Sequence, residues 1–226
     1  MKTRISKSLM VVVAAGCFSA LAVEPSEARA CGGEWAPEVY IDHRIQGVAR
    51  AEKMFEAGKV DQAAATVIRM MPHIATLKAS RSTLVERSQR MLAVAVARAD
   101  GALPVAEEVP DYARGTWLGA KDADRQTNLS WAVSALRQVD ELKKDDPSVQ
   151  TELAEVLAKV PEHKKEARTI LESLAQRDLV STPEGYAVLA ELRKEAGDAK
   201  GQKVALERCA AMAKSAAVCR STEAQS

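Results

Sequence analysis

Histidine, cysteine and carboxylate side chains are the residues of this chain that could hold a metal ion or catalyse a reaction. The three histidines, His43, His73 and His163, lie far apart in the sequence. No two of them are three or four residues apart, as paired ligands on one helix would be for zinc. We therefore predict no metal site, and we expect no cofactor.

Two other catalytic patterns are incomplete. Residues 115–121 contain glycines and a lysine, like a phosphate-binding loop, but one residue too few separates the glycines. Asp122 also stands where a hydroxyl should hold magnesium. No Gly-x-Ser-x-Gly elbow occurs, and no cysteine lies near a histidine in the sequence. We therefore predict no catalytic residue and expect that the protein is not an enzyme.

Residues 1–30 have the three parts of a cleavable secretory signal of bacterial type. Lys2, Arg4 and Lys7 form a basic start, an apolar run covers residues 9–23, and Ala-Arg-Ala ends the segment. The apolar run is shorter than the roughly 20 residues that a membrane-spanning helix needs. We predict an exported protein that resides in the periplasm, at the outer membrane or outside the cell.

A lipid anchor is the alternative to a simply cleaved signal, because a lipoprotein signal ends just before an acylated cysteine. Cys17 and Cys31 both follow small residues. However, Cys17 lacks the large aliphatic residue that a lipoprotein signal usually has three positions before the cysteine. Arg29 is a charged residue where such a signal usually has small ones before Cys31. A cleaved signal without a lipid is therefore the favoured interpretation.

The cysteines at the other end of the chain, Cys209 and Cys219, are candidates for a disulfide bond. Cysteines tend to pair in an oxidising compartment. Ten residues of continuous helix would separate them by about 15 Å, whereas a disulfide tolerates less than about 7 Å between Cα atoms. The bond therefore requires the helix to end near Ser215 and the tail to fold back. The alternatives are a bond from Cys31 to either cysteine and no bond at all.

Charge and composition restrict the class of fold and partner. The chain has 32 Lys and Arg and 31 Asp and Glu, and residues 1–30 hold four and two of these, which leaves 28 and 29. Such a balance gives no basic surface for nucleic acid. Most of the abundant residue types are good helix formers. The sequence predicts an all-α protein with no nucleic-acid partner and no membrane span in the mature chain.

Helical spacing of apolar residues and helix-ending signals predict eight helices. Asp42 and Thr182 stand where they can cap helices, and Gly58 stands where it can end one. The expected helices cover residues 42–57, 61–71, 82–99, 122–144, 148–159, 162–177, 183–196 and 199–215. An extended arm at residues 31–42 precedes them, and a polar tail at residues 217–226 follows them. Lys, Arg and Glu alternate along the helices, which is typical of ordinary surface ion pairs.

One long connection, residues 101–121, interrupts these helices. Loops of this length inside a compact array are usually functional or disordered. Tyr112, Trp117 and Leu118 make the loop too apolar for complete disorder. They either hold the loop against the helices or form part of a protein-binding surface. Our hypothesis is that the loop binds a partner together with the groove-facing sides of the helices expected at 122–144 and 148–159.

A short sequence repeat organises the second half of the chain. Residues 153–155 read Leu-Ala-Glu, and the same three residues return 36 positions later at 189–191. The helix pair expected at 42–71 can be aligned in the same frame. The tetratricopeptide-repeat family has a comparable frame, in which a small residue is followed at fixed distances by a glycine, an alanine and a large apolar residue. The first pair fills all four places with Ala51, Gly58, Ala63 and Val67. The last pair fills three with Ala190, Gly197 and Leu206, and the pair before it fills two with Ala154 and Ile170.

This pattern resembles a degenerate form of the tetratricopeptide-repeat (TPR) family. The resemblance implies a stack of about four helix-turn-helix hairpins, a TPR-like α-solenoid over residues 43–216. It also implies a concave groove that binds a protein partner or a peptide segment. We therefore expect a non-catalytic scaffold or adaptor in the bacterial cell envelope. The alternatives are an envelope enzyme or enzyme subunit with a site in the 101–121 loop, and a structural outer-membrane lipoprotein.

Overall fold

The computed structural model describes residues 42–103 and 124–220, and every regular element in these two stretches is helical. They contain eight α-helices and three short 3₁₀ turns. Contacts divide the chain into two units, Met1–Tyr40 and Ile41–Ser226, and all of the described helices belong to the second. The all-α expectation is therefore confirmed for the described residues.

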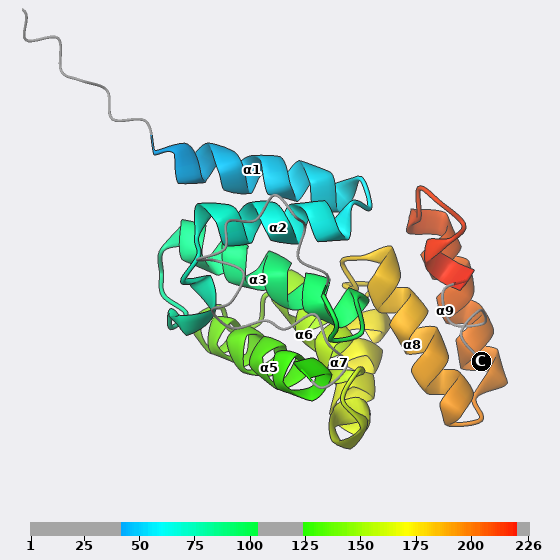
Figure 1. Ribbon diagram of the computed structural model, residues 1–226. Helices are drawn as coiled ribbons and strands as arrows, with labels where there is room; N and C mark the ends of the chain where they lie inside the picture. Colours follow the sequence, from blue (N-terminus) through cyan, green and yellow to red (C-terminus); the bar gives the residue numbers. More distant parts are fainter. Residues whose placement is uncertain (1–41, 104–123, 221–226) are drawn as a thin grey trace, which may run out of the picture. The chain divides into compact units, whose positions relative to one another are not determined.

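The α-helices pack against their chain neighbours in four consecutive pairs (Figure 1). The pairs are α1 (His43–Glu56) with α2 (Val60–Met70), α3 (Thr83–Arg98) with α5 (Arg125–Leu142), α6 (Pro147–Leu157) with α7 (Lys164–Gln176), and α8 (Pro183–Glu195) with α9 (Ala199–Met212). Short 3₁₀ turns lie after α2 (η1, Ile74–Thr76), before α7 (η3, Pro161–His163) and after α9 (η4, Val218–Arg220).

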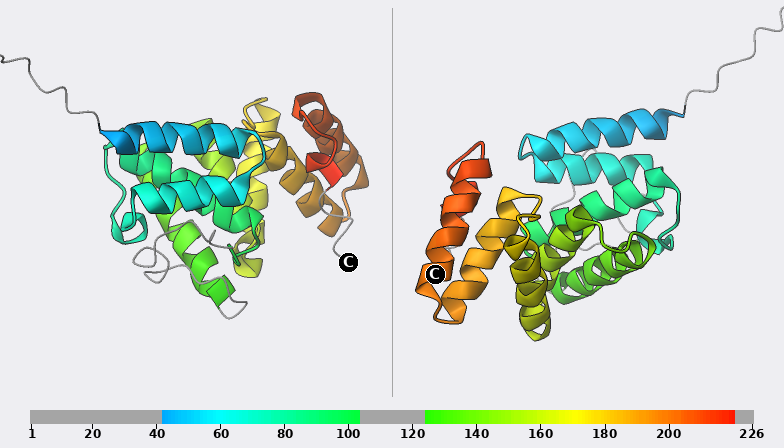
Figure 2. Two further views of the ribbon diagram at one scale, coloured as in Figure 1. Left: turned by 45° about the horizontal axis from the view of Figure 1, so that its top comes forward. Right: turned by 180° about the vertical axis from the view of Figure 1, so that it is seen from behind.

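Each pair is joined to the next in the same way. The second helix of one pair contacts the first helix of the following pair, as α2 does with α3, α5 with α6, and α7 with α8. The first helices also contact one another in series, from α1 to α3, α6 and α8. Both views of Figure 2 show α8 and α9 to one side of the other pairs. The first helices therefore form a continuous row within this unit.

The helix ends follow from residues that are visible in the sequence. The side chains of Asp42, Asp146, Thr182 and Asp198 accept hydrogen bonds from backbone N–H groups in the first turns of α1, α6, α8 and α9, which satisfies donors that the helix leaves unpaired. Gly58 and Gly197 follow the ends of α1 and α8 with φ of +75° and +76°. A side chain is disfavoured in this left-handed conformation, so both positions favour glycine.

Small buried residues lie where the pairs come together. Ala51, Ala154 and Ala190, the small residues of the repeat frame, are all buried. Large apolar side chains surround them and form one core, of which Leu92, Leu136, Leu157, Leu171 and Leu189 are fully buried members. The small residue of the frame is therefore a buried core position in the three pairs that carry the frame.

Several sequence-based expectations fall on residues 1–41, 104–123 and 221–226, which lie outside the described residues. They include the signal peptide, nearly all of the 31–42 arm and most of the 101–121 loop. The start of the tail is described, and it is not simply a polar end. Its residues Val218–Arg220 form η4, which contacts α8 and α9, and α9 ends at Met212, earlier than expected.

Candidate functional site

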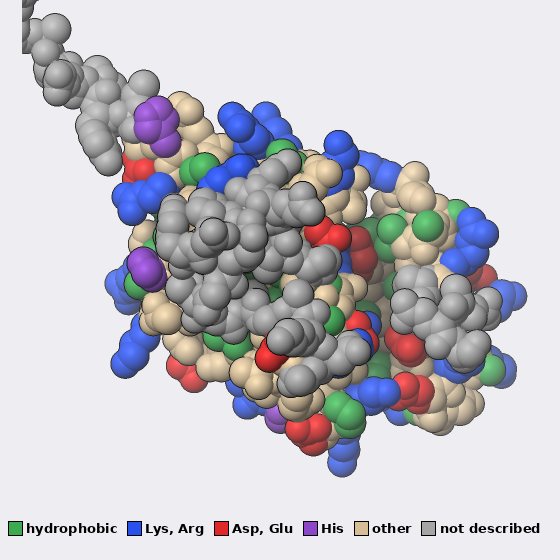
Figure 3. All heavy atoms as spheres, viewed as in Figure 1, with side chains coloured by type: hydrophobic (Ala, Val, Ile, Leu, Met, Phe, Trp, Pro, Cys, Tyr) green, Lys and Arg blue, Asp and Glu red, His purple; other side chains and the backbone are tan. Residues whose placement is uncertain are grey.

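A groove of about 370 Å³ lies on the row of first helices. Three of these helices, α1, α3 and α6, line it together with the residue that caps α8. The lining residues are Glu52, Phe55, Glu56, Arg87, Arg90, Met91, Val94, Arg98, Glu152 and Thr182. Figure 3 shows the surface hollowed between the ends of α1–α3 and α8, with acidic and hydrophobic side chains in the hollow.

One face of α3 supplies half of this lining. Arg87, Arg90 or Met91, Val94 and Arg98 follow one another at helical spacing, which places them along a single face. Met91 and Val94 are buried, and Phe55 of α1 is partly buried against the same core. The result is a floor of three apolar side chains, Phe55, Met91 and Val94, with an arginine at each end.

The first two arginines of this face bond to glutamates of other pairs. Arg87 makes two hydrogen bonds to the carboxylate of Glu52 on α1, with Nε 2.6 Å from Oε1. Arg90 donates to both oxygens of Glu152 on α6, at 2.7 and 2.8 Å, and to Ser148 Oγ at 2.7 Å. Arg90 is also 3.4 Å from buried Glu86 on its own helix. These bonds tie α3 to α1 and to α6.

The third arginine, Arg98, connects α3 with both later pairs. Its terminal nitrogens are 3.1 Å from Glu155 on α6 and 2.9 Å from Glu184 on α8. The guanidinium also lies over the Phe55 ring, 4.7 Å from its centroid, a distance suited to a cation–π interaction. Thr182 completes the cluster, because its hydroxyl donates to Glu155 at 2.6 Å. Arg98 therefore contacts a residue of each of the other three first helices, α1, α6 and α8.

The environment of these charges changes their pKa values. Burial raises the pKa of Glu155, although Arg98 and the hydrogen bond from Thr182 act in the opposite direction. Burial lowers the pKa of Arg90, but the hydrogen bond and charge of Glu152 outweigh it, so the pKa is raised overall. The pKa of Arg87 is raised by its hydrogen bond to Glu52. The raised pKa values keep Arg87 and Arg90 cationic, whereas burial favours the protonated form of Glu155.

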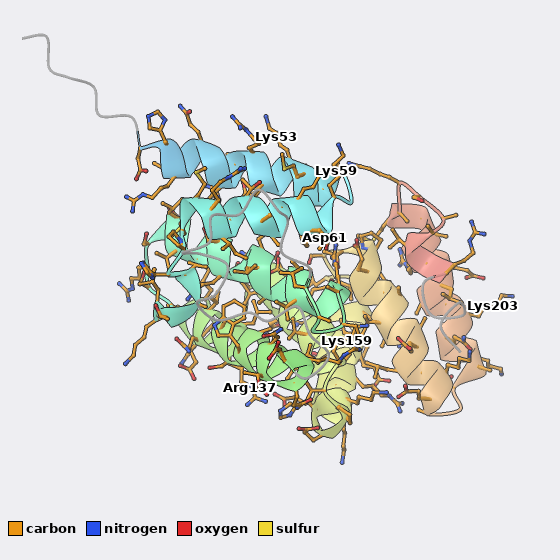
Figure 4. All side chains as sticks on the ribbon, viewed as in Figure 1. Lys53, Lys59, Asp61, Arg137, Lys159 and Lys203 are labelled. Atoms are coloured by element: carbon orange, nitrogen blue, oxygen red, sulfur yellow. A yellow bond between two sulfur atoms is a disulfide. The ribbon has the colours of Figure 1, made fainter. Side chains whose placement is uncertain are left out.

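Glu56 differs from the other carboxylates of the lining. It is exposed at the last residue of α1, and no ion pair joins it to another of the described residues. Figure 4 shows Lys53 on the side of α1 that faces away from α2, and Lys59 at the turn between these helices. Neither lysine belongs to the lining. Glu56 is thus available to a ligand.

The disulfide between Cys209 and Cys219 is present, as expected, with Cα atoms 5.9 Å apart. The chain turns back after Met212, so that η4 contacts both α8 and α9. A second hollow lies beside the bond and is lined by Cys219 and by alanines of α9 and the turn that follows it, with Leu206 and Arg220. The disulfide therefore fastens the end of the chain to the last helix pair.

The sequence-predicted binding residues Tyr112, Trp117 and Leu118 lie outside the described residues, so they remain a prediction. Of the two helices expected beside the groove, α6 contributes Glu152, whereas α5 contributes none of the described lining. The arginine face of α3 was missed, because its charges were interpreted as surface ion pairs. The helical spacing of Arg87, Arg90 and Arg98 was the signal that could have revealed it.

Comparisons with protein-family models, with curated proteins and with solved structures found no match to this chain. Within residues 42–103 and 124–220, no helix combines the length and apolar character needed to cross a membrane. The same residues contain no group of three or more His, Cys, Asp or Glu that could hold a metal ion.

Proposed function

We propose that this chain is an exported, non-catalytic scaffold of TPR-like helical repeats that binds a segment of a partner protein in the groove. The observation that carries the proposal is the row of first helices, which presents an apolar floor between paired charges. Each helix pair contributes one element to the row, so a ligand in the groove would contact several pairs at once. The N-terminal sequence pattern supports export to the bacterial cell envelope.

The arrangement of the charges favours binding over catalysis. Acid–base chemistry generally needs a titratable group that faces the substrate with its pKa shifted towards the working pH. Glu155, whose pKa is raised, is instead buried beneath Arg98 and Thr182. The arginines hold the first helices in register, and the partly buried Phe55 and its neighbours offer an apolar contact. Such apolar and aromatic anchors supply much of the energy of protein recognition.

Capture experiments with matched variants test this function. The purified protein, Phe55→Ala and Leu142→Ala would each be immobilised and exposed to an envelope extract of the source organism. Leu142 is a suitable control because it is an exposed apolar residue in the last turn of α5, outside the groove lining. We expect Phe55→Ala to lose a partner that both the wild-type protein and Leu142→Ala retain.

A thermal melt of each variant, together with Phe55→Leu, separates lost binding from lost folding. Leucine keeps an apolar side chain in the floor, so Phe55→Leu should fold and retain part of the binding. Capture that is equal for the wild type, Phe55→Ala and Leu142→Ala would contradict binding in the groove.

A further inference from the structure

Among the residues that the structure describes, the lining of the groove and the side chains bonded to it together carry more carboxylates than cations. The cations are Arg87, Arg90 and Arg98, together with Lys143, which is 2.8 Å from Glu86. The carboxylates are Glu52, Glu56 and Glu152 in the lining, with Glu86, Glu155 and Glu184 bonded to its arginines. Even with Glu155 protonated, carboxylates remain in excess. The field in the groove therefore favours a cationic ligand.

The arginines already have their own acceptors. Arg87 makes two bonds to Glu52, Arg90 bonds to Glu152 and Ser148, and Arg98 bonds to Glu155 and Glu184. An acidic ligand would have to displace a carboxylate of the protein from each guanidinium that it engaged. A basic ligand faces no such competition, because Glu56 is exposed and has no ion-pair partner among the described residues.

The size of the groove restricts the apolar part of the ligand. Its volume of about 370 Å³ is near the lower end of the range of ligand pockets, which is roughly 300–1,000 Å³. The apolar floor of Phe55, Met91 and Val94 lies beside Glu56, which follows Phe55 directly in the sequence. One or two apolar side chains of a bound partner segment fill such a space, and the next side chain of that segment lies at the edge of the groove.

Building on the proposed function, we infer that the groove selects a partner segment in which an apolar side chain is flanked by lysine or arginine. The apolar side chain contacts the floor of Phe55, Met91 and Val94. The flanking cation pairs with Glu56, and the surplus of carboxylates in the groove strengthens the attraction. Glu56 is thus a specificity-determining residue, whereas Arg87, Arg90 and Arg98 position the helices.

An unbiased peptide selection tests this inference. A library of displayed 12-residue random peptides would be selected against the purified protein, and individual peptides would be measured by fluorescence anisotropy. We expect the selected peptides to share an apolar residue beside Lys or Arg. Glu56→Gln should weaken them by about two- to fivefold, the effect of losing an exposed ion pair, and Glu56→Lys should weaken them further. Added salt should reduce the difference between wild type and Glu56→Gln.

Glu141→Gln is the matched control, because Glu141 is an exposed glutamate in the last turn of α5 and lies outside the lining. It should leave peptide binding unchanged. Some selected peptides should no longer bind Phe55→Ala. If these peptides were rich in Asp and Glu, or bound Glu56→Gln as tightly as the wild type, the charge preference would be overturned and groove binding would remain intact. If no selected peptide depended on Phe55 in a folded variant, both the inference and the proposed function would fail.

Discussion

Replacing Glu155 with alanine tests whether the buried ion pair joins the second, third and fourth helix pairs. The carboxylate is buried, 3.1 Å from Arg98 and 2.6 Å from the Thr182 hydroxyl. Removing one partner of a buried ion pair costs about 3–5 kcal/mol. In this variant Arg98 would still have Glu184 at 2.9 Å as a partner, and 21% of its side chain is exposed to solvent. We therefore expect the free energy of unfolding to fall by about 3 kcal/mol, the lower end of this range.

Glu155→Gln separates the charge of this side chain from its size and hydrogen bonds. The amide retains an oxygen that can accept from Thr182, so we expect its free energy of unfolding to be within about 1 kcal/mol of wild type near neutral pH. Because burial raises the pKa of Glu155, the folded state binds a proton more tightly than the unfolded state. The stability of the wild type relative to Glu155→Gln should therefore rise as pH falls through the raised pKa towards the ordinary carboxyl value of about 4.3.

Urea unfolding followed by circular dichroism, at about pH 7.5 and about pH 5, measures these differences. Glu141→Ala serves as the control and should change the free energy of unfolding by no more than about 0.5 kcal/mol, as exposed substitutions usually do. If Glu155→Ala were as stable as this control, the buried pair would not hold the helices together. A difference between wild type and Glu155→Gln that stayed constant with pH would refute the raised pKa.

Three further predictions concern the ends of the chain and one turn. Replacing Cys209 and Cys219 with serine should lower the free energy of unfolding by about 2–3 kcal/mol, because the bond closes a short loop; urea unfolding with and without a dithiol checks this, and equal stability would count against the bond. Gly58→Ala should lower the free energy of unfolding by about 1 kcal/mol, because φ is +75° and alanine disfavours this left-handed conformation. The added Cβ has no neighbour within 4 Å, so no steric clash adds to this cost. The same unfolding experiment measures the change, and an unchanged midpoint would contradict the left-handed turn. The exported protein should begin at Cys31, which intact mass determines, and a retained N-terminus or added acyl chains would refute simple cleavage.

The helices could be predicted from the sequence because their ends depend on local chemistry. Asp42 caps α1 through a hydrogen bond to a residue two positions away, and Thr182 caps α8 over three positions. Gly58 and Gly197 mark turns because their backbone conformation disfavours other residues. Pairing of neighbouring helices follows from short connections in three of the four pairs, α1 with α2, α6 with α7 and α8 with α9. The pair of α3 and α5 is the exception, because the long connection at residues 101–121 separates these helices in the sequence.

The groove could not be predicted in the same way, because its contacts join residues that are distant in the chain. Arg90 and Glu152 are 62 positions apart, and Arg98 and Glu155 are 57. Whether such side chains meet depends on which helix faces turn inward after packing. On a single helix, Arg90 and Glu86 resemble an ordinary exposed pair, yet Glu86 is buried and both bond to other helices. Partial burial, rather than residue type, distinguishes Arg90 and Arg98 from surface arginines.

Site-specific photocrosslinking in living cells tests most directly whether the groove binds a partner. A photoreactive phenylalanine analogue, which keeps the aromatic ring, would replace Phe55 in the floor of the groove, and in a separate strain it would replace Glu141 on α5. We expect irradiation to produce a discrete adduct with an envelope protein from position 55 and none from position 141. No adduct from position 55, or the same adduct from both positions, would contradict binding in the groove.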